Sequence, residues 1–180
     1  MTAPRGRPLV AVLVGTDHHP FQRLVTWAST LASEGWADWF VQHGSAQWPE
    51  TDQSGAQGAR VVDQPTLRDL LERAQCVVCH AGPGLLMDAA SAGHRPIVVA
   101  RDPTKGEHVD GHQIDFAQRM ARADRIETAG DLGTLRSQVR ATLQRPSSSS
   151  VSGLESASTC DRFGSLVAAA VSSRRPALMR

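Results

Sequence analysis

The chain has 180 residues, of which 41% are apolar, and its 19 Lys and Arg against 18 Asp and Glu give a formal net charge of +1 at pH 7. This length supports one domain with a full core and excludes two complete Rossmann-like halves with their connections. The balanced charge excludes a strongly basic nucleic-acid-binding surface, because such a surface needs excess cationic side chains to displace counterions from phosphates.

The first third of the chain predicts two buried strands with a helix between them. Residues 9–14 are continuously apolar, as in a strand that is covered on both faces. Pro20 suits a first helical position, and the apolar residues that follow repeat at helical spacing, which predicts a helix over 21–33. Residues 39–42 predict a second strand, and the Ser-, Gln- and Gly-rich segment 43–59 predicts a mobile loop.

The alternation of strands and helices continues to residue 143. In chain order we expect a strand at 60–62, a helix at 65–73, a strand at 76–79, a helix at 84–93, a strand at 96–100, a helix with Gln113, Phe116, Ala117 and Met120 on one face, a weak strand near Ile126, and a helix over 132–143. Apolar strands separated by helices predict a parallel sheet with right-handed crossovers. The fold class is therefore α/β, a Rossmann-like parallel sheet with helices on both faces.

The C-terminal segment differs in composition from the rest of the chain. Pro146 and the four serines after it favour a flexible linker. We predict one Rossmann-like domain over 1–145, and a linker and tail over 146–180 with a short helix within 164–173. No segment approaches the roughly 20 apolar residues that span a bilayer, and the first apolar run is too short for a secretory leader. We expect a cytoplasmic protein.

The polar motifs follow the predicted strands at one edge of the sheet. Ligands in wound parallel sheets bind at the carboxyl ends of the strands, which here are the loops 15–20, 81–84 and 101–111. The middle loop is Gly-rich and precedes a helix, so it offers backbone N–H groups and the positive end of a helix dipole to an anion. This arrangement suits a nucleotide diphosphate. Asp88, which we expect in the first turn of that helix, would accept hydrogen bonds from a ribose diol.

Each of these features also has an interpretation without a ligand. The glycines would serve a tight turn, Asp88 would be a solvated residue near a helix N-terminus, and His18 and His19 would be exposed beside a helix start. We favour a binding site because the Gly-rich turn, Asp88 and the polar cluster at 110–113 all fall on the same edge of the sheet.

His108 and His112, with Asp110 between them, raise the question of a metal ion. Zinc would need a third protein ligand at fixed geometry, and the sequence has no compact signature such as H-E-x-x-H. Gly106 and Gly111 also weaken a helix across the two histidines. We therefore expect no metal and no other cofactor.

Several blocks of the chain resemble glycosyltransferase family 28. They are His80-Ala81-Gly82-Pro83-Gly84 with Asp88, Gly93-His94-Arg95-Pro96-Ile97-Val98-Val99, and Asp110-Gly111-His112-Gln113-Ile114-Asp115-Phe116-Ala117. The loop Val14-Gly15-Thr16-Asp17-His18-His19-Pro20-Phe21 is similar to the bacterial exopolysaccharide members. The likeness runs from about Val10 to Leu143. It is to the C-terminal, donor-binding half of the family, and within it to stand-alone small subunits such as those of dolichol-linked N-acetylglucosamine transfer.

The resemblance implies one half of a GT-B glycosyltransferase. Such a subunit would use a nucleotide sugar, most simply a UDP-sugar, in an inverting and metal-independent transfer to a lipid-linked saccharide. A membrane-associated partner subunit would supply the acceptor half and hold the chain at the inner face of the membrane. The resemblance also implies that Asp88 contacts ribose and that His112 and Gln113 reach the sugar. It assigns no catalytic base.

The candidate substrate-binding residues are Gly15, Thr16, His18, His80, Gly82, Gly84, Asp88, Asp110, His112 and Gln113. Thr16 would hydrogen-bond a phosphate, and one histidine of its loop would contact the diphosphate or the acceptor. His80 would shape the Gly-rich turn, touch the diphosphate, or be a buried histidine bonded to a backbone carbonyl. Two other functions stay open: a nucleotide-sugar-binding or scaffolding subunit without a catalytic role, and a Rossmann-like binder of another phosphate compound.

Overall fold

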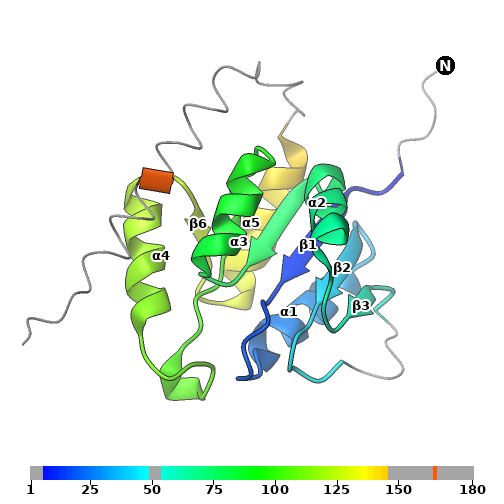
Figure 1. The fold of residues 1–180 in the computed structure, drawn as a ribbon. Helices are drawn as coiled ribbons and strands as arrows, with labels where there is room; N and C mark the ends of the chain where they lie inside the picture. Colours follow the sequence, from blue (N-terminus) through cyan, green and yellow to red (C-terminus); the bar gives the residue numbers. More distant parts are fainter. Residues whose placement is uncertain (1–5, 49–53, 146–163, 166–180) are drawn as a thin grey trace, which may run out of the picture.

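A computed structural model describes residues 6–48, 54–145 and 164–165, which form a parallel sheet between two layers of helices (Figure 1). The strands are β1 (Leu9–Leu13), β2 (Asp38–Gln42), β3 (Gln57–Ala59), β4 (Cys76–Cys79), β5 (Ile97–Val98) and β6 (Glu127–Thr128). The helices are α1 (Gln22–Ala32), α2 (Gln64–Arg73), α3 (Pro83–Ser91), the short η1 (Pro103–Lys105), α4 (His112–Arg122) and α5 (Leu132–Gln144). The linker and tail predicted over 146–180 lie outside the described residues, except for 164–165.

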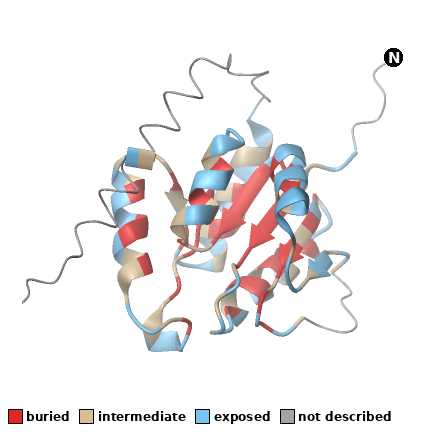
Figure 2. Ribbon diagram, in the orientation of Figure 1, coloured by how far each residue is buried: buried red, intermediate tan, exposed pale blue. Residues whose placement is uncertain are grey.

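The sheet has the order β3-β2-β1-β4-β5-β6, and all its pairs are parallel. Helices α1 and α5 cover one face, where they pack on Val10 and Val12. Helices α2, α3 and α4 cover the other face, where they pack on Ala11 and Leu13. Successive residues of β1 therefore enter opposite halves of the core, which explains the unbroken apolar run of this strand. Figure 2 shows the strands as the buried centre of the domain. The predicted fold class is confirmed.

Capping residues and apolar periodicity account for most helix boundaries. The side chain of Asp63 accepts a hydrogen bond from the backbone N–H of Thr66 at 2.9 Å and begins α2, and Asp131 begins α5 in the same way. The buried residues of α4 are the four predicted to share a face: Gln113, Phe116, Ala117 and Met120. No helix in the described part of the chain has both the length and the apolar character needed to cross a membrane.

The position predicted for the third strand was wrong. Strand β3 lies at Gln57–Ala59, inside the segment predicted as a loop, and not at 60–62. It is an edge strand that pairs only with β2, so its side chains are not enclosed by the sheet and carry no apolar signal. Gly58 packs directly under an indole, because a Cβ at this position would lie 2.3 Å from Trp48 Cε2. Val61, expected within the strand, is 57% exposed.

Candidate functional site

A hollow of about 540 Å³ opens at the carboxyl edge of the sheet, beside the ends of β1, β2 and β4. Its volume lies in the range typical of small-molecule sites. The predicted site residues in its lining are Gly15, Thr16, His80, Gly82, Gly84 and Asp88. A larger hollow of about 1160 Å³ lies at the opposite edge, by the starts of β1 and β2. It contains none of the predicted residues, and the carboxyl edge is where such sheets bind ligands.

The N-terminus of α3 borders the hollow. Its N-cap is Gly82, no side chain caps the helix, and the backbone N–H of Leu86 donates to the carbonyl of Gly82 at 3.1 Å. Pro83 has no N–H, so helix geometry leaves the N–H groups of Gly84 and Leu85 without a partner within the helix. Both residues line the hollow. Two such donors at the positive end of a helix dipole form an anion-binding corner.

Asp88 was expected in the first turn of this helix, and that expectation was wrong. Since α3 begins at Pro83, Asp88 is in its second turn, and the first turn has no acidic residue. The carboxylate is exposed and borders both the hollow and a groove of about 420 Å³ between α2 and α3. A ribose bound by Asp88 would therefore extend from the hollow toward α2.

The ring of His80 lies between two glycines of the predicted site. A Cβ at Gly15 would lie 2.5 Å from His80 Cε1, and a Cβ at Gly82 would lie 2.2 Å from His80 Nε2. Burial, reinforced by the positive charge of Arg101, lowers the pKa of His80 to about 4, so the imidazole is neutral at pH 7. Its Nδ1 has no hydrogen-bond partner among the described residues.

Gln42, which sequence reasoning missed, holds the first loop. Its side-chain Oε1 accepts the backbone N–H of Gly15 at 2.9 Å, and its Nε2 donates to the carbonyl of Gly15 at 3.0 Å. The N–H of Gly15 is therefore used within the protein, and this glycine shapes the hollow without donating to a ligand. Thr16, next in the loop, is exposed at the rim. A polar residue that ends a buried strand was the available signal for Gln42.

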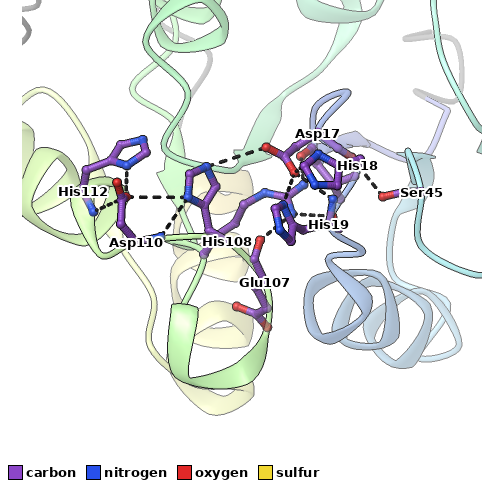
Figure 3. A network of polar contacts seen from close by, with 10 residues as sticks. Asp17, His18, His19, Ser45, Glu107, His108, Asp110 and His112 are labelled. Atoms are coloured by element: carbon purple, nitrogen blue, oxygen red, sulfur yellow. Dashed lines mark hydrogen bonds and ion pairs between the residues drawn. The ribbon is translucent and has the colours of Figure 1, made fainter.

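A second group of side chains lies beside the hollow and forms the network in Figure 3. Asp17 belongs to both groups, because it lines the hollow and its Oδ1 accepts hydrogen bonds from the backbone N–H and the Nδ1 of His19, each at 2.7 Å. Partial burial acts to raise the pKa of Asp17, but the bonds from His19 and the charge of Arg101 lower it to about 2. Asp17 is therefore a carboxylate at neutral pH.

The other members of the network come from the loop before α4 and from its first residue. His108 lies between two carboxylates: its Nε2 is 3.6 Å from Asp17 Oδ2, and its Nδ1 is 3.6 Å from Asp110 Oδ1. Asp110 also accepts hydrogen bonds from the backbone N–H of His112 at 3.1 Å and from the Nδ1 of its ring. Burial, and then the neighbouring His112, lower the pKa of His108.

Arg101, a fully buried residue that sequence reasoning missed, joins the two loops of the network. Its Nη1 donates to the carbonyls of His19 at 2.7 Å and Glu107 at 3.0 Å, and its Nη2 donates to the carbonyl of Val14 at 2.8 Å. Glu107 in turn forms a bidentate ion pair with Arg23, with distances of 2.8 and 2.7 Å. A single arginine after a predicted strand carries no periodic signal that would indicate this burial.

Apart from Gln113, the predicted residues fall into two neighbouring groups joined by Asp17. The side chain of His18 is 84% exposed. Gln113 lies on the buried face of α4, is 6% exposed, and is not in the lining of the hollow with Gly84 and Asp88. Its Oε1 has no hydrogen-bond partner in the described part of the chain.

Known proteins agree with this architecture. The chain is 34% identical over 61 residues to "UDP-N-acetylglucosamine transferase subunit ALG13" of Yarrowia lipolytica, a match that covers 34% of this chain and 29% of that protein. Similar solved structures include the calicheamicin glycosyltransferase CalG4 (TM-score 0.61, 12% identity, covering 94% of this chain and 40% of that one) and SnogD from Streptomyces nogalater (TM-score 0.59, 17% identity, covering 94% and 43%).

These solved structures are GT-B glycosyltransferases, and the chain spans less than half of each. Its fold is therefore that of one half of the GT-B architecture. The family model of the "Glycosyltransferase family 28 C-terminal domain" matches residues 9–159, which is most of the chain. The chain therefore belongs to glycosyltransferase family 28 and carries its C-terminal domain.

Proposed function

We propose that this chain is the donor-binding subunit of an inverting, metal-independent glycosyltransferase. It would bind a UDP-sugar and act with a membrane-associated partner subunit that supplies the acceptor half and a lipid-linked saccharide. The observation that carries this proposal is the hollow in a family 28 domain, bordered by the carboxylate of Asp88 and by the N–H groups of Gly84 and Leu85, which have no partner within the helix. These groups match the diphosphate and the ribose of a nucleotide sugar.

The reaction would be a single displacement at the anomeric carbon. The acceptor oxygen forms a bond to this carbon from the side opposite the leaving group, while the bond between the carbon and the diphosphate oxygen breaks. Negative charge then grows on the diphosphate, where the N–H groups of Gly84 and Leu85 and the hydroxyl of Thr16 would stabilise it. The acceptor proton passes to a base in the partner half. Fixed backbone donors stabilise the leaving group without a cation.

The remaining contacts concern the ribose and the sugar. The exposed carboxylate of Asp88 can accept two hydrogen bonds from a ribose diol. His112, at the start of α4, would orient the sugar, and Gln113, which is buried on the inner face of that helix, would act only by supporting its position. The ring of His80 is neutral at pH 7 and would support the Gly-rich turn against the first loop.

Two observations support a partner subunit. The chain matches less than half of each similar GT-B structure, and the proposed partner would supply the acceptor half. The relative from Yarrowia lipolytica is likewise named as a transferase subunit. We infer a cytoplasmic location, with the partner holding the chain at the inner face of a membrane.

Nucleotide binding tests the site directly. Uridine diphosphate should raise the melting temperature of the wild type, because a ligand that binds the native state stabilises it. Asp88→Ala should reduce this shift, and Asp38→Ala should not, since Asp38 is an exposed carboxylate at the opposite edge of the sheet. If uridine diphosphate gives no shift at millimolar concentration, a binder of another phosphate compound becomes the better reading.

Catalysis requires the partner. Co-expression with the product of a neighbouring gene should give sugar transfer that Asp88→Ala lowers and Asp38→Ala leaves unchanged. A pair that transfers sugar equally well with Asp88→Ala would show that Asp88 has no part in the active site. Binding of a nucleotide sugar with no transfer by the pair would favour the non-catalytic subunit.

A further inference from the structure

The network of histidines and aspartates contains more metal-ligating groups than the proposed transfer uses. We propose that His108, Asp110 and His112 form a binding site for a divalent transition-metal ion, with Zn²⁺ as the best fit, and that Asp17 supports this site as the outer partner of His108 (Figure 3). The proposal goes beyond the glycosyl transfer, which needs no ion. The ion would fix the loop before α4 against the first loop of the domain.

The spacing of the three side chains fits one shared ion. One ligand atom from each of the three residues lies within 4.8 Å of the others, and His108 Nδ1 is 3.6 Å from Asp110 Oδ1. This distance is too long for a good hydrogen bond. Two ligands of a tetrahedral zinc ion lie about 3.3 Å apart, given metal–ligand distances near 2.0–2.1 Å. The ion would replace two present hydrogen bonds, from the backbone N–H of Asp110 to His108 Nδ1 at 3.4 Å and between the ring of His112 and Asp110.

The second nitrogen of His108 faces the carboxylate of Asp17, which is placed to serve as the outer partner of a metal-bound ring. Histidine ligands usually direct their other ring nitrogen to a carboxylate, which fixes the orientation of the ring. Here His108 Nε2 lies 3.6 Å from Asp17 Oδ2. Asp17 is held by two hydrogen bonds from His19, and the carbonyl of His19 is held by the buried Arg101. The supporting shell is therefore assembled from a separate part of the chain.

The donor set indicates which ion would bind. Two imidazole nitrogens and one carboxylate oxygen suit Zn²⁺, whereas Mg²⁺ and Ca²⁺ prefer oxygen ligands alone. Three protein ligands with a fourth position for water form an established zinc arrangement. The sequence argument against a metal cited the need for a third ligand, the absence of a compact signature, and the glycines that weaken a helix across the two histidines. The structure places His108 in the loop and His112 at the first residue of α4, so the two side chains meet without sharing a helix; their ring centroids are 4.6 Å apart.

Asp17, His18 and His19 offer a second set of ligand atoms within 4.8 Å. This set is less suitable, because the side chain of His18 is 84% exposed and the ring of His19 already forms a 2.7 Å hydrogen bond with Asp17. His18 therefore provides a variant that separates the two possibilities.

The test measures Zn²⁺ binding to the untagged full-length chain by calorimetry, after treatment with EDTA. We expect one ion per chain for the wild type. His112→Ala and Asp110→Asn should each weaken binding at least about 100-fold, since losing an outer partner alone costs roughly 10–100-fold, and Asp17→Asn should fall in that smaller range. His18→Gln should bind like the wild type. Co²⁺ should give the strong visible absorption of a four-coordinate ion, and Mg²⁺ should not bind.

The outcomes are decisive in both directions. The proposal is overturned if the wild type binds Zn²⁺ no more tightly than His112→Ala, or if His18→Gln loses as much affinity as His112→Ala. Equal melting temperatures of the wild type and His112→Ala in EDTA would show that the variant is folded, as expected for a side chain that is 32% exposed. Uridine diphosphate binding is measured separately in EDTA, so failure of the metal site and failure of the donor site are distinguishable.

Discussion

The packing of His80 between Gly15 and Gly82 allows a sharp test of the site geometry. Gly82→Ala introduces a methyl group 2.2 Å from His80 Nε2, although its own φ of −85° and ψ of 124° suit any residue. The ring cannot yield without approaching Gly15, where a Cβ would lie 2.5 Å from His80 Cε1. The cost of Gly82→Ala is therefore steric and depends on the imidazole.

The expected magnitudes follow from this geometry. Overpacking of this kind costs about 1–3 kcal/mol of the free energy of unfolding. Gly15→Ala should cost about 1–2 kcal/mol more, because Gly15 has a φ of 82° that strains a residue with a Cβ. In a His80→Ala background, Gly82→Ala should cost roughly nothing or stabilise by about 0.4–1 kcal/mol, since alanine restricts the unfolded chain. Gly15→Ala should then keep only its backbone cost.

Urea unfolding, followed by tryptophan fluorescence and circular dichroism, measures both double-mutant cycles. A coupling of about 1–3 kcal/mol between residues 80 and 82 would confirm the steric contact. The reasoning is refuted if Gly82→Ala costs the same with His80 present and absent.

Three further predictions concern stability. From pH 7 to pH 5, the free energy of unfolding of the wild type should fall by about 2 kcal/mol more than that of His80→Gln, as measured by urea titration. The reason is that the unfolded histidine takes up a proton near its ordinary pKa, whereas folded His80, with a pKa of about 4, does not. Equal losses in the two proteins would contradict burial of a neutral ring. Arg101→Met should destabilise by at least about 3 kcal/mol, since three carbonyls lose a buried cationic donor, and a loss below about 1 kcal/mol in chemical denaturation would contradict this. Glu34→Gln, by contrast, weakens the surface ion pairs with Arg136 and Arg140, so it should lower the free energy of unfolding by at most about 1 kcal/mol, and by less at high salt. A larger loss that does not depend on salt would contradict the surface location of these ion pairs.

Periodic and topological features of this chain could be predicted from sequence. The buried face of α4 follows the helical repeat, and the unbroken apolar run of β1 reflects burial on both faces of the sheet. Parallel topology then brings the ends of β1 and β4 to one edge, which is why residues as distant as Thr16 and Gly84 share a hollow. These inferences depend on regular geometry alone.

The features that sequence reasoning missed depend on particular contacts. The edge strand β3 is only three residues long and largely exposed, so it shows no apolar alternation. Asp88 is the sixth residue of α3 counted from Pro83, so it lies in the second turn. Arg101 acts on carbonyls up to 87 positions away, and Asp17 meets His108 across the same two loops. Contacts between loops leave no repeat in the sequence.

The donors at the start of α3 belong to the main chain, and this has a practical consequence for mutational scanning. Replacing Gly84 or Leu85 with alanine retains both N–H groups, so a scan of side chains would overlook the part of the hollow best suited to hold an anion. Proline at position 85, or exchange of a single amide for an ester, would remove a donor and reveal its contribution. Relatives could likewise vary every side chain in this corner and preserve its attraction for negative charge.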